Sequence, residues 1–523
     1  MERLTGEWRL YKVAAWLFLA GMLLFLGKVP LYLEEPRRAL VAMEMLASGN
    51  YWASTLFGEW YYNKPPLFNW VLLLFAWLGG GFREWALRLP TVLSVAGLAG
   101  LLFLSGKTYV SARFGMVSSL LFVSFSAVLF YFSALAEIDL FYALIVFGGL
   151  LAIYHFGERK QYGLLFFLVY LSCALGVLAK GLPSLAFTAL SLLAYFIDKK
   201  RFKTLFSPAH IGGILLLSGL LGAYAWKYAQ YNNPLFLLET LVGESSDRTV
   251  ASNSARDFFR QLVVFPLDVF KDLLPGGLLA IFLFRRDARD FLFQRHPFIR
   301  FCMLMLLVNI ALYWLSPGTR IRYVYPLFPF AACVLAWGYE RRGETAVWAS
   351  RFFRTSAGVV TSLFALGALT LPFMPDLRFI PYIWPASAGF ALVFAGLGFV
   401  WRRRPDWSLP LLLISLGVAR LLFDLTVLPQ RAHDTEAQRN KALAAQIHQL
   451  ADDRPLYLYG EKKVLSFTSS FYLNRLRRQP IRLQDQLQRG QYYLMPLDLT
   501  GKRDSVLLRF EYERRGKGLV IRR

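Results

Sequence analysis

Long stretches without charge, each of the length that a bilayer requires, constrain the fold of this chain more than any other feature. Only 18% of the 523 residues are charged and 56% are hydrophobic, whereas water-soluble proteins have about 25% charged residues. A helix needs about 20 apolar residues to cross the hydrocarbon core. The sequence therefore predicts an all-α polytopic membrane protein with about thirteen transmembrane helices, over residues 13–33, 88–106, 114–136, 140–157, 163–179, 182–197, 211–228, 261–284, 299–316, 321–339, 356–374, 381–400 and 408–428.

The positive charges between these stretches predict their orientation. Six basic clusters fall on the same side as the N-terminus, which we place in the cytoplasm because Lys and Arg accumulate in cytoplasmic loops. The same rule explains the net charge of +24. We expect no nucleic-acid partner, because the sequence has no basic stripe that is joined to a nucleic-acid-binding motif. The first apolar stretch is too long for the core of a signal peptide, so we expect a retained helix. An odd number of spans places the C-terminus on the opposite, outer side of the membrane.

Two domains are expected, a transmembrane domain over residues 1–429 and a soluble periplasmic α/β domain over 430–523. The transmembrane domain has two large outer loops, 34–87 and 229–260. In the first, Leu67–Leu78 is too short to span and is typical of an interfacial helix. The tail predicts helices and strands by its hydrophobic periodicity: helices at Thr435–Leu450 and Ser466–Leu473, and strands at Pro455–Tyr459, Tyr492–Leu497 and Val506–Tyr512.

Polar residues at the outer ends of the predicted spans are the candidates for chemistry. Asp139 stands out because almost no loop separates its two spans, and a carboxylate near the hydrocarbon costs up to roughly 3 kcal/mol. We therefore expect it to have a partner or a function. The lysines also fit snorkelling side chains, and the arginines fit interfacial anchors. The full set of candidates is Glu34, Glu35, Arg37, Tyr62, Lys64, Asp139, Lys180, Glu244, Arg248, Arg320, Arg322, Tyr323 and Tyr325.

Carboxylates and cations on one face of a membrane suit the displacement of a lipid phosphate from a sugar. A carboxylate can remove a proton from the attacking group. Fixed cations, or a divalent metal, can stabilise the departing phosphate. A soluble enzyme that uses nucleotide sugars would need a glycine-rich or Asp-x-Asp site on a large soluble domain, and the sequence has no such site.

Read together, these motifs resemble the integral-membrane glycosyltransferases with the GT-C fold, which include the protein O-mannosyltransferases and the lipid A aminoarabinose transferases. The similarity to the aminoarabinose branch covers the first 330 residues. Its motifs are Glu34-Glu35-Pro36-Arg37, Glu44-Met45-Leu46-Ala47-Ser48-Gly49-Asn50, Tyr62-x-Lys64-Pro65-Pro66-Leu67, Arg88-Leu89-Pro90, Ile138-Asp139, Lys180-Gly181, Glu244…Arg248 and Tyr323-x-Tyr325-Pro326-x-x-Pro329. In the tail, Ser469-Ser470-Phe471-Tyr472-Leu473 is similar to the pattern of the small outer domain.

The resemblance implies inverting transfer of a sugar from a polyprenyl phosphate, such as undecaprenyl phosphate, on the outer face. It places Glu34 at the position of a base and Asp139 at a second acidic position. It assigns Lys64, Arg37 and Arg248 to the donor phosphate, to which we add Arg320 and Arg322.

At four positions the sequence departs from the family pattern, so the resemblance does not identify the acceptor or imply a metal. Glu34 stands for the usual Asp, Arg38 for Tyr, Asn63 for an acidic residue and Ser245 for His.

The acceptor is expected to be a lipid A phosphate, a protein hydroxyl or a growing glycan, and the chain is expected to act as a monomer. Two alternatives remain at this point. A flippase or transporter for lipid-linked sugars would show internal repeats and charges at mid-membrane, and neither is evident. A polymerase or ligase of surface glycans with diphosphate-linked donors is closer in class.

Overall fold

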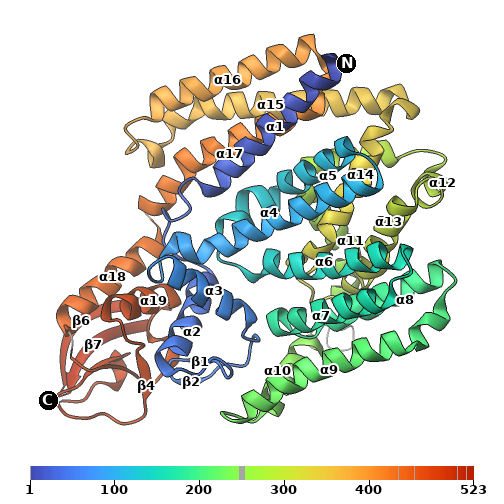
Figure 1. Ribbon diagram of the computed structural model, residues 1–523. Coiled ribbons are helices and arrows are strands. Elements are labelled where there is room, and N and C mark those ends of the chain that lie inside the picture. The colour runs from blue at the N-terminus through green and yellow to red at the C-terminus, as the bar shows by residue number, and fades with distance from the viewer. Residues whose placement is uncertain are drawn as a thin grey trace. The chain divides into compact units, whose positions relative to one another are not determined.

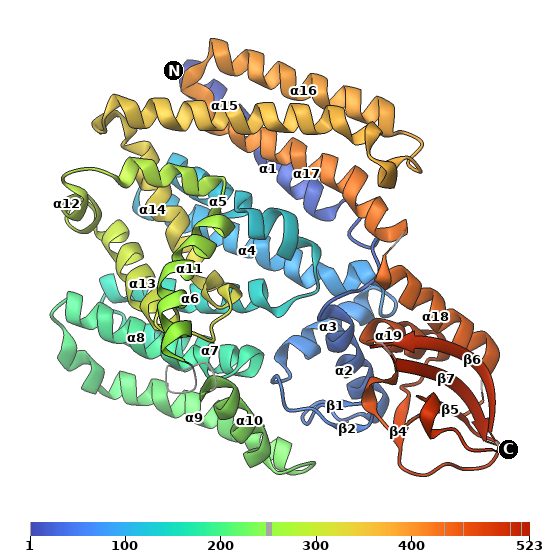
Figure 2. The same cartoon turned by 180° about the vertical axis from the view of Figure 1, so that it is seen from behind.

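The computed structural model describes residues 2–246, 254–433, 435–452, 454–502, 504–513 and 515–522 (Figures 1 and 2). The chain divides into two compact units, each built from separate stretches of sequence. The first unit comprises Met1–Phe25, Thr91–Ala223 and Leu238–Leu428. The second unit comprises Leu26–Pro90, Tyr224–Leu237 and Pro429–Arg523.

Within the described residues, nine helices are long and apolar enough to cross a membrane. They match nine of the expected spans: α4 (Glu84–Tyr109), α6 (Ile138–Glu158), α7 (Tyr162–Lys180), α9 (Pro208–Ala229), α13 (Pro297–Trp314), Ile321–Glu340 with α14 (Phe328–Glu340), α15 (Val347–Thr370), α16 (Ile383–Arg403) and α17 (Ser408–His433). In the first unit α6 packs along α7 and α15 along α16 (Figures 1 and 2). The predicted class, a polytopic helical membrane protein with a small α/β region, is confirmed.

The four other expected spans are shorter, bent or divided. Residues 114–136 become α5 (Ala112–Ser124) and Ala127–Ala134, joined at a 58° bend that gives a tenth span if the pair counts as one. Residues 13–33 correspond to α1 (Glu2–Leu23), and 182–197 to α8 (Pro183–Asp198). Residues 261–284 divide into α11 (Ala255–Leu273) and a 3-10 helix, Gly276–Leu283, because Pro275 lacks the N–H that would continue the helix.

The tail forms a five-stranded mixed sheet with the strand order β4-β3-β5-β7-β6. Strand β3 (Leu456–Tyr459) is parallel to β4 (Arg482–Gln484) and β5 (Tyr492–Pro496), while β7 (Arg515–Arg522) is antiparallel to β5 and β6 (Asp504–Tyr512). Helices α18 (Glu436–Ala451) and α19 (Phe467–Arg477) accompany the sheet (Figure 1). Both helices and three of the strands were predicted from the sequence.

The first outer loop contributes helix α2 (Glu35–Ser48), a small hairpin of β1 (Thr55–Leu56) and β2 (Glu59–Trp60), and α3 (Leu67–Leu78). Helix α3 has 12 residues, too few to span a bilayer. Its Trp77 is 76% exposed and its Leu78 is also exposed. An apolar helix of this length with an exposed Trp fits the predicted interfacial position.

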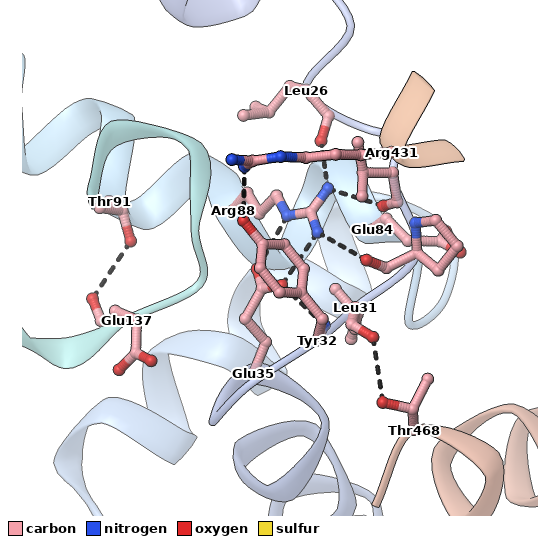
Figure 3. A network of polar contacts seen from close by, with 12 residues as sticks. Leu26, Leu31, Tyr32, Glu35, Glu84, Arg88, Thr91, Glu137, Arg431 and Thr468 are labelled. Atoms are coloured by element: carbon pink, nitrogen blue, oxygen red, sulfur yellow. Dashed lines mark hydrogen bonds and ion pairs between the residues drawn. The ribbon is translucent and has the colours of Figure 1, made fainter. Parts of the chain in front are cut away.

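Hydrogen bonds join the tail to this first loop within the second unit. The hydroxyl of Tyr472 accepts from the N–H of Leu31 (3.0 Å) and donates to Glu84 Oε1 (2.8 Å). Thr468 Oγ1 donates to the carbonyl of Leu31 at 3.2 Å (Figure 3). The N–H of Leu483, in β4, donates to the carbonyl of Phe57 at 3.0 Å. Residues far apart in sequence thus share one compact unit.

A buried ion pair fixes the chain where helix α2 begins. Arg88 Nε lies 2.8 Å from Glu35 Oε1, and Arg88 Nη2 lies 2.9 Å from Glu35 Oε2 (Figure 3). The remaining guanidinium N–H groups donate to the carbonyls of Leu26, Val29 and Pro30 at 2.9, 2.9 and 3.2 Å. Both side chains are fully buried, so neither charge has water as an alternative partner.

We expect Arg88→Met and Glu35→Gln each to lower the apparent melting temperature of the detergent-purified protein. Each single change leaves a buried group without its partner, which typically costs about 3–5 kcal/mol. The double variant should be less destabilised than either single one, because it leaves no unpaired charge. Thermal unfolding followed by tryptophan fluorescence measures this, with Arg489→Gln at an exposed position as the control. Melting curves of Arg88→Met that match the wild type would contradict the assignment.

Candidate functional site

Asp139 lies in the first turn of α6 and is almost fully buried, with 1% of its surface exposed. Its Oδ1 accepts a hydrogen bond from Lys180 Nζ at 2.5 Å. Lys180 is the last residue of α7 and is buried too. The sequence predicted both residues as site candidates and predicted that Asp139 needs a partner, and the structure identifies Lys180 as that partner.

Two tyrosine rings and an arginine surround this pair in the first unit. Lys180 Nζ lies 5.0 Å from the ring centre of Tyr142 and 4.8 Å from that of Tyr323, which suits cation–π attraction. Arg322 Nη1 lies 3.8 Å from Asp139 Oδ2. Because Arg322 is partly exposed while Asp139 is not, Arg322 is the member of this cluster that a ligand can reach most directly.

One oxygen of Asp139 has no hydrogen bond. Oδ2 is buried and has no hydrogen-bond partner within the described residues, although Arg322 stands nearby. A buried carboxylate oxygen without a donor is costly. It can accept a proton or a hydrogen bond from a hydroxyl or amine group, as the acceptor of a transfer reaction would offer.

The neighbouring candidates have different surroundings. The hydroxyl of Tyr325 donates to Asp272 Oδ2 at 3.1 Å, and Asp272 was not singled out from the sequence. Arg320 precedes the 3-10 turn Ile321–Leu327 and is exposed. The structure thus brings Asp139, Lys180, Arg322 and Tyr323 together.

The backbone that leads to Asp139 is irregular and is held by a buried arginine. After α5 the chain forms a π-helical turn, Ala127–Tyr131, and a 3-10 turn, Phe132–Ala134. Arg420 of α17 donates to the carbonyl of Leu129 and to Ser133 Oγ (2.9 Å), and pairs with Asp424 Oδ1 at 2.9 Å. Backbone groups freed by a break within a membrane need such partners.

A further hydrogen bond holds the end of this irregular segment. Thr91 Oγ1 donates to the carbonyl of Glu137 at 3.2 Å (Figure 3). The segment before Asp139 is therefore fixed by side chains of α17 and α4.

In the second unit, Glu34 and Arg37 form an ion pair at the start of α2. The Arg37 guanidinium lies 5.9 Å from the ring centres of both Tyr61 and Phe467. Both charged side chains are partly exposed, so a substrate can reach them. Leu33, just before them, has a φ of +57°, a strained conformation that is common at functional sites.

Lys64 and Tyr62 lie in the turn between β2 and α3. The Tyr62 hydroxyl accepts a hydrogen bond from Asn232 Nδ2 at 2.8 Å, and its ring packs edge-on against Phe236. Lys64 is half-buried, and the prolines that follow it, Pro65 and Pro66, are buried. The turn is therefore anchored on both sides of Lys64.

Arg38 is a candidate that the sequence reasoning noted only as a departure from the family pattern. It is 4% exposed, and its Nε and Nη1 have no hydrogen-bond partner within the described residues. A buried guanidinium with unsatisfied N–H groups is unfavourable unless an anion or an acceptor reaches it. The signal was available: two adjacent arginines follow the acidic residues Glu34 and Glu35 after a single proline.

Three of the predicted candidates remain, and the structure describes the side chain of one of them. Glu35 pairs with Arg88, as described above, and so has a structural contact. Arg248 lies outside the described residues, as does the side chain of Glu244. In the part of the chain that the structure describes, no three His, Cys, Asp or Glu side chains gather as a metal site. We assign no step of the reaction to a metal.

Comparison with known proteins gives concordant results. Residues 63–226 match the family model of dolichyl-phosphate-mannose-protein mannosyltransferases. The undecaprenyl phosphate-alpha-4-amino-4-deoxy-L-arabinose arabinosyl transferase 1 of Sodalis glossinidius is 27% identical over 83% of this chain and 78% of its own length. The corresponding protein of Pseudomonas fluorescens is 25% identical over 74% of this chain and 68% of its own.

The crystal structure of ArnT from Cupriavidus metallidurans bound to undecaprenyl phosphate superimposes with a TM-score of 0.71. The match covers 99% of this chain and 98% of that one, at 17% sequence identity. The chain is similar in sequence to aminoarabinose transferases and has the fold of ArnT. The resemblance drawn from the motifs is thereby confirmed, while the roles of single residues stay predictions.

We expect Arg420→Met to loosen the irregular segment before Asp139. The loss of hydrogen bonds from a charged donor, each worth about 1.5–3 kcal/mol, should raise the open population of the segment about tenfold or more. In a Ser133→Cys background, the rate of maleimide labelling in detergent reports this opening, since Ser133 is fully buried. Ser207→Cys, in the loop before α9, should label at the same rate with and without Arg420. Equal labelling of the cysteine at 133 in both backgrounds would show that Arg420 does not hold the segment.

Proposed function

We propose that this chain transfers a sugar from an undecaprenyl-phosphate-linked donor to an acceptor at the periplasmic face of the bacterial inner membrane. The homology to undecaprenyl phosphate aminoarabinose transferases supports the reaction class. The single observation that carries the proposal is the buried carboxylate of Asp139. It is held by Lys180 and approached by Arg322.

The donor phosphate needs cations that a lipid-bound ligand can reach. We assign Lys64, Arg37, Arg320 and Arg322 to this role, with Arg248 as a further candidate. Arg322 and Arg37 are partly exposed, and a guanidinium binds phosphate oxygens through two parallel N–H groups. We add Arg38, whose unsatisfied Nε and Nη1 can meet an anion at the start of α2.

The proposed reaction is a displacement at the anomeric carbon. A carboxylate, Glu34 or Asp139, takes the proton of the acceptor nucleophile as this atom bonds to the anomeric carbon. The bond between that carbon and the phosphate oxygen breaks on the opposite face, so the configuration inverts. Its electron pair stays on undecaprenyl phosphate, whose extra charge the arginines and Lys64 stabilise. The proton remains on the carboxylate until water removes it.

The position of the charged pair favours a transferase over a flippase of lipid-linked sugars. A flippase would place ionisable groups along a path across the membrane, whereas Asp139 and Lys180 stand at the ends of α6 and α7. A polymerase or ligase of surface glycans uses the same attack on a lipid-linked donor, so the reaction class is shared. The acceptor classes remain a lipid A phosphate, a protein hydroxyl or a glycan.

We expect Asp139→Asn and Lys64→Ala each to lower turnover by about two orders of magnitude or more, the usual size of a lost catalytic carboxylate or phosphate-binding cation. The measurement is transfer of radiolabelled sugar from a membrane extract of lipid-linked donors to outer-surface lipids, proteins and glycans. Arg489→Gln serves as the exposed control. Size-exclusion profiles show whether the variants fold. A folded Asp139→Asn or Lys64→Ala protein with wild-type transfer would reject the assignment.

The proposed orientation predicts that Lys64 and Asp139 both lie at the outer side of the membrane, opposite the basic loop at Lys199–Arg201. Single cysteines at Asn63 and at Tyr131, an exposed residue in the connection that leads to Asp139, should react in intact spheroplasts with a thiol reagent that cannot cross membranes. A cysteine at Lys200 should react only after lysis, because Lys and Arg mark cytoplasmic loops. Labelling of Lys200→Cys before lysis, or of Asn63→Cys only after it, would overturn the topology.

A further inference from the structure

A cavity of about 670 Å³ in the second unit has no role in the proposed reaction. Its wall is formed by α2, by the loop between α3 and α4, and by the end of α19. None of the residues assigned to the donor or to proton transfer lines it. The side chains that line the cavity are therefore available to bind a ligand other than the sugar donor and the acceptor.

Three arginines line the cavity, against one carboxylate. Arg475 Nη1 donates to Glu84 Oε2 at 3.0 Å and to the carbonyl of Phe82 at 3.3 Å. Arg83 and Arg478 are exposed and form no ion pair with the described carboxylates. The excess of positive charge favours an anion, and arginine suits phosphate oxygens in particular.

A buried amide adds a second, independent signal. Asn474 lines the same cavity but is only 2% exposed. Its Oδ1 accepts from the N–H of Ile481 at 3.0 Å, while its Nδ2 has no hydrogen-bond partner within the described residues. Buried donors are almost always satisfied in proteins. An oxygen-bearing ligand in the cavity would supply the acceptor after a small adjustment of the side chain.

The other half of the ligand is indicated by apolar side chains. Met43 and Leu46 line the cavity beside the arginines, and Leu46 is exposed. The loop that forms the cavity wall, Gly80–Arg83, directly follows the exposed Trp77 and Leu78 of α3. Trp and Leu exposed at the end of a short apolar helix are typical of the membrane interface. A ligand with an anionic head and apolar chains would contact both the arginines and the apolar side chains of the cavity.

We propose that this cavity binds the phosphate headgroup of an anionic phospholipid from the surrounding leaflet. The phosphate lies among Arg83, Arg475 and Arg478, with Asn474 as a further donor, and the acyl chains lie along Leu46 and the end of α3. Since Arg475 also bonds Glu84 and the Phe82 carbonyl, the lipid ties α19 of the tail to the loop after α3. This binding does not depend on the proposed transfer reaction.

Native mass spectrometry of the full-length, detergent-purified chain tests the site. We expect the protein to retain phosphatidylglycerol about tenfold or more over phosphatidylcholine with the same acyl chains. Arg83→Gln/Arg478→Gln should abolish this preference. Asn474→Asp keeps the Oδ1 acceptor for Ile481 but replaces the donor with a negative charge, so it should weaken the binding of phosphatidylglycerol too.

The matched control is Arg489→Gln/Arg509→Gln, which removes two exposed arginines of the same unit outside the cavity. It should keep the wild-type preference. Equal retention of the two lipids, or the same loss in the control, would overturn the proposal. Full displacement of phosphatidylglycerol by millimolar inorganic phosphate would show a phosphate site without a lipid requirement, and would overturn the lipid assignment as well.

Discussion

The contact between Glu35 and Arg88 determines how helix α2 begins, and through it the position of the proposed donor-binding residues. All five N–H groups of the guanidinium have acceptors, two on the carboxylate and three on the carbonyls of residues 26–30. Moving either charge alone into such a site would cost several kcal/mol. The two charges are therefore stable only when they are paired in this geometry. The geometry fixes the start of α2, and with it the positions of Glu34 and Arg37 at its N-terminal end.

The two proposed clusters share a simple electrostatic arrangement. Each holds a carboxylate against a cation, Glu34 with Arg37 and Asp139 with Lys180, and each offers a further arginine. Among the described residues, two N–H groups of Arg38 find no acceptor and one oxygen of Asp139 finds no hydrogen-bond donor. Low polarity around such groups strengthens any interaction that a ligand makes with them. A lipid-linked phosphate and a nucleophilic hydroxyl carry the complementary atoms.

Much of the fold could be predicted because its signals are local. Apolar length predicts the spans, and alternation or helical periodicity predicts α18, α19, β3, β5 and β6. The three-residue β4 and the basic, glycine-containing β7 lack such patterns. They become strands because they pair with neighbouring strands, which local sequence does not show. In the candidate site, the sequence showed that Asp139 needs a partner but could not select Lys180, 41 residues away. The pair Arg420 and Asp424 could have been recognised, because opposite charges four residues apart within an apolar span are rare. The prediction of 408–428 as an ordinary span did not take them into account.

The second unit combines chain made early in synthesis with chain made much later. Its first stretch, Leu26–Pro90, holds α2 and α3, yet Leu31, Phe57 and Glu84 each form hydrogen bonds with residues of 429–523. Since the ribosome delivers the chain from the N-terminus, this first stretch is synthesised well before the residues of the tail that hold it. Completion of the tail then supplies these partners, so a chain truncated after α17 would carry the long apolar helices but lack the hydrogen bonds that the tail gives to Leu31, Phe57 and Glu84.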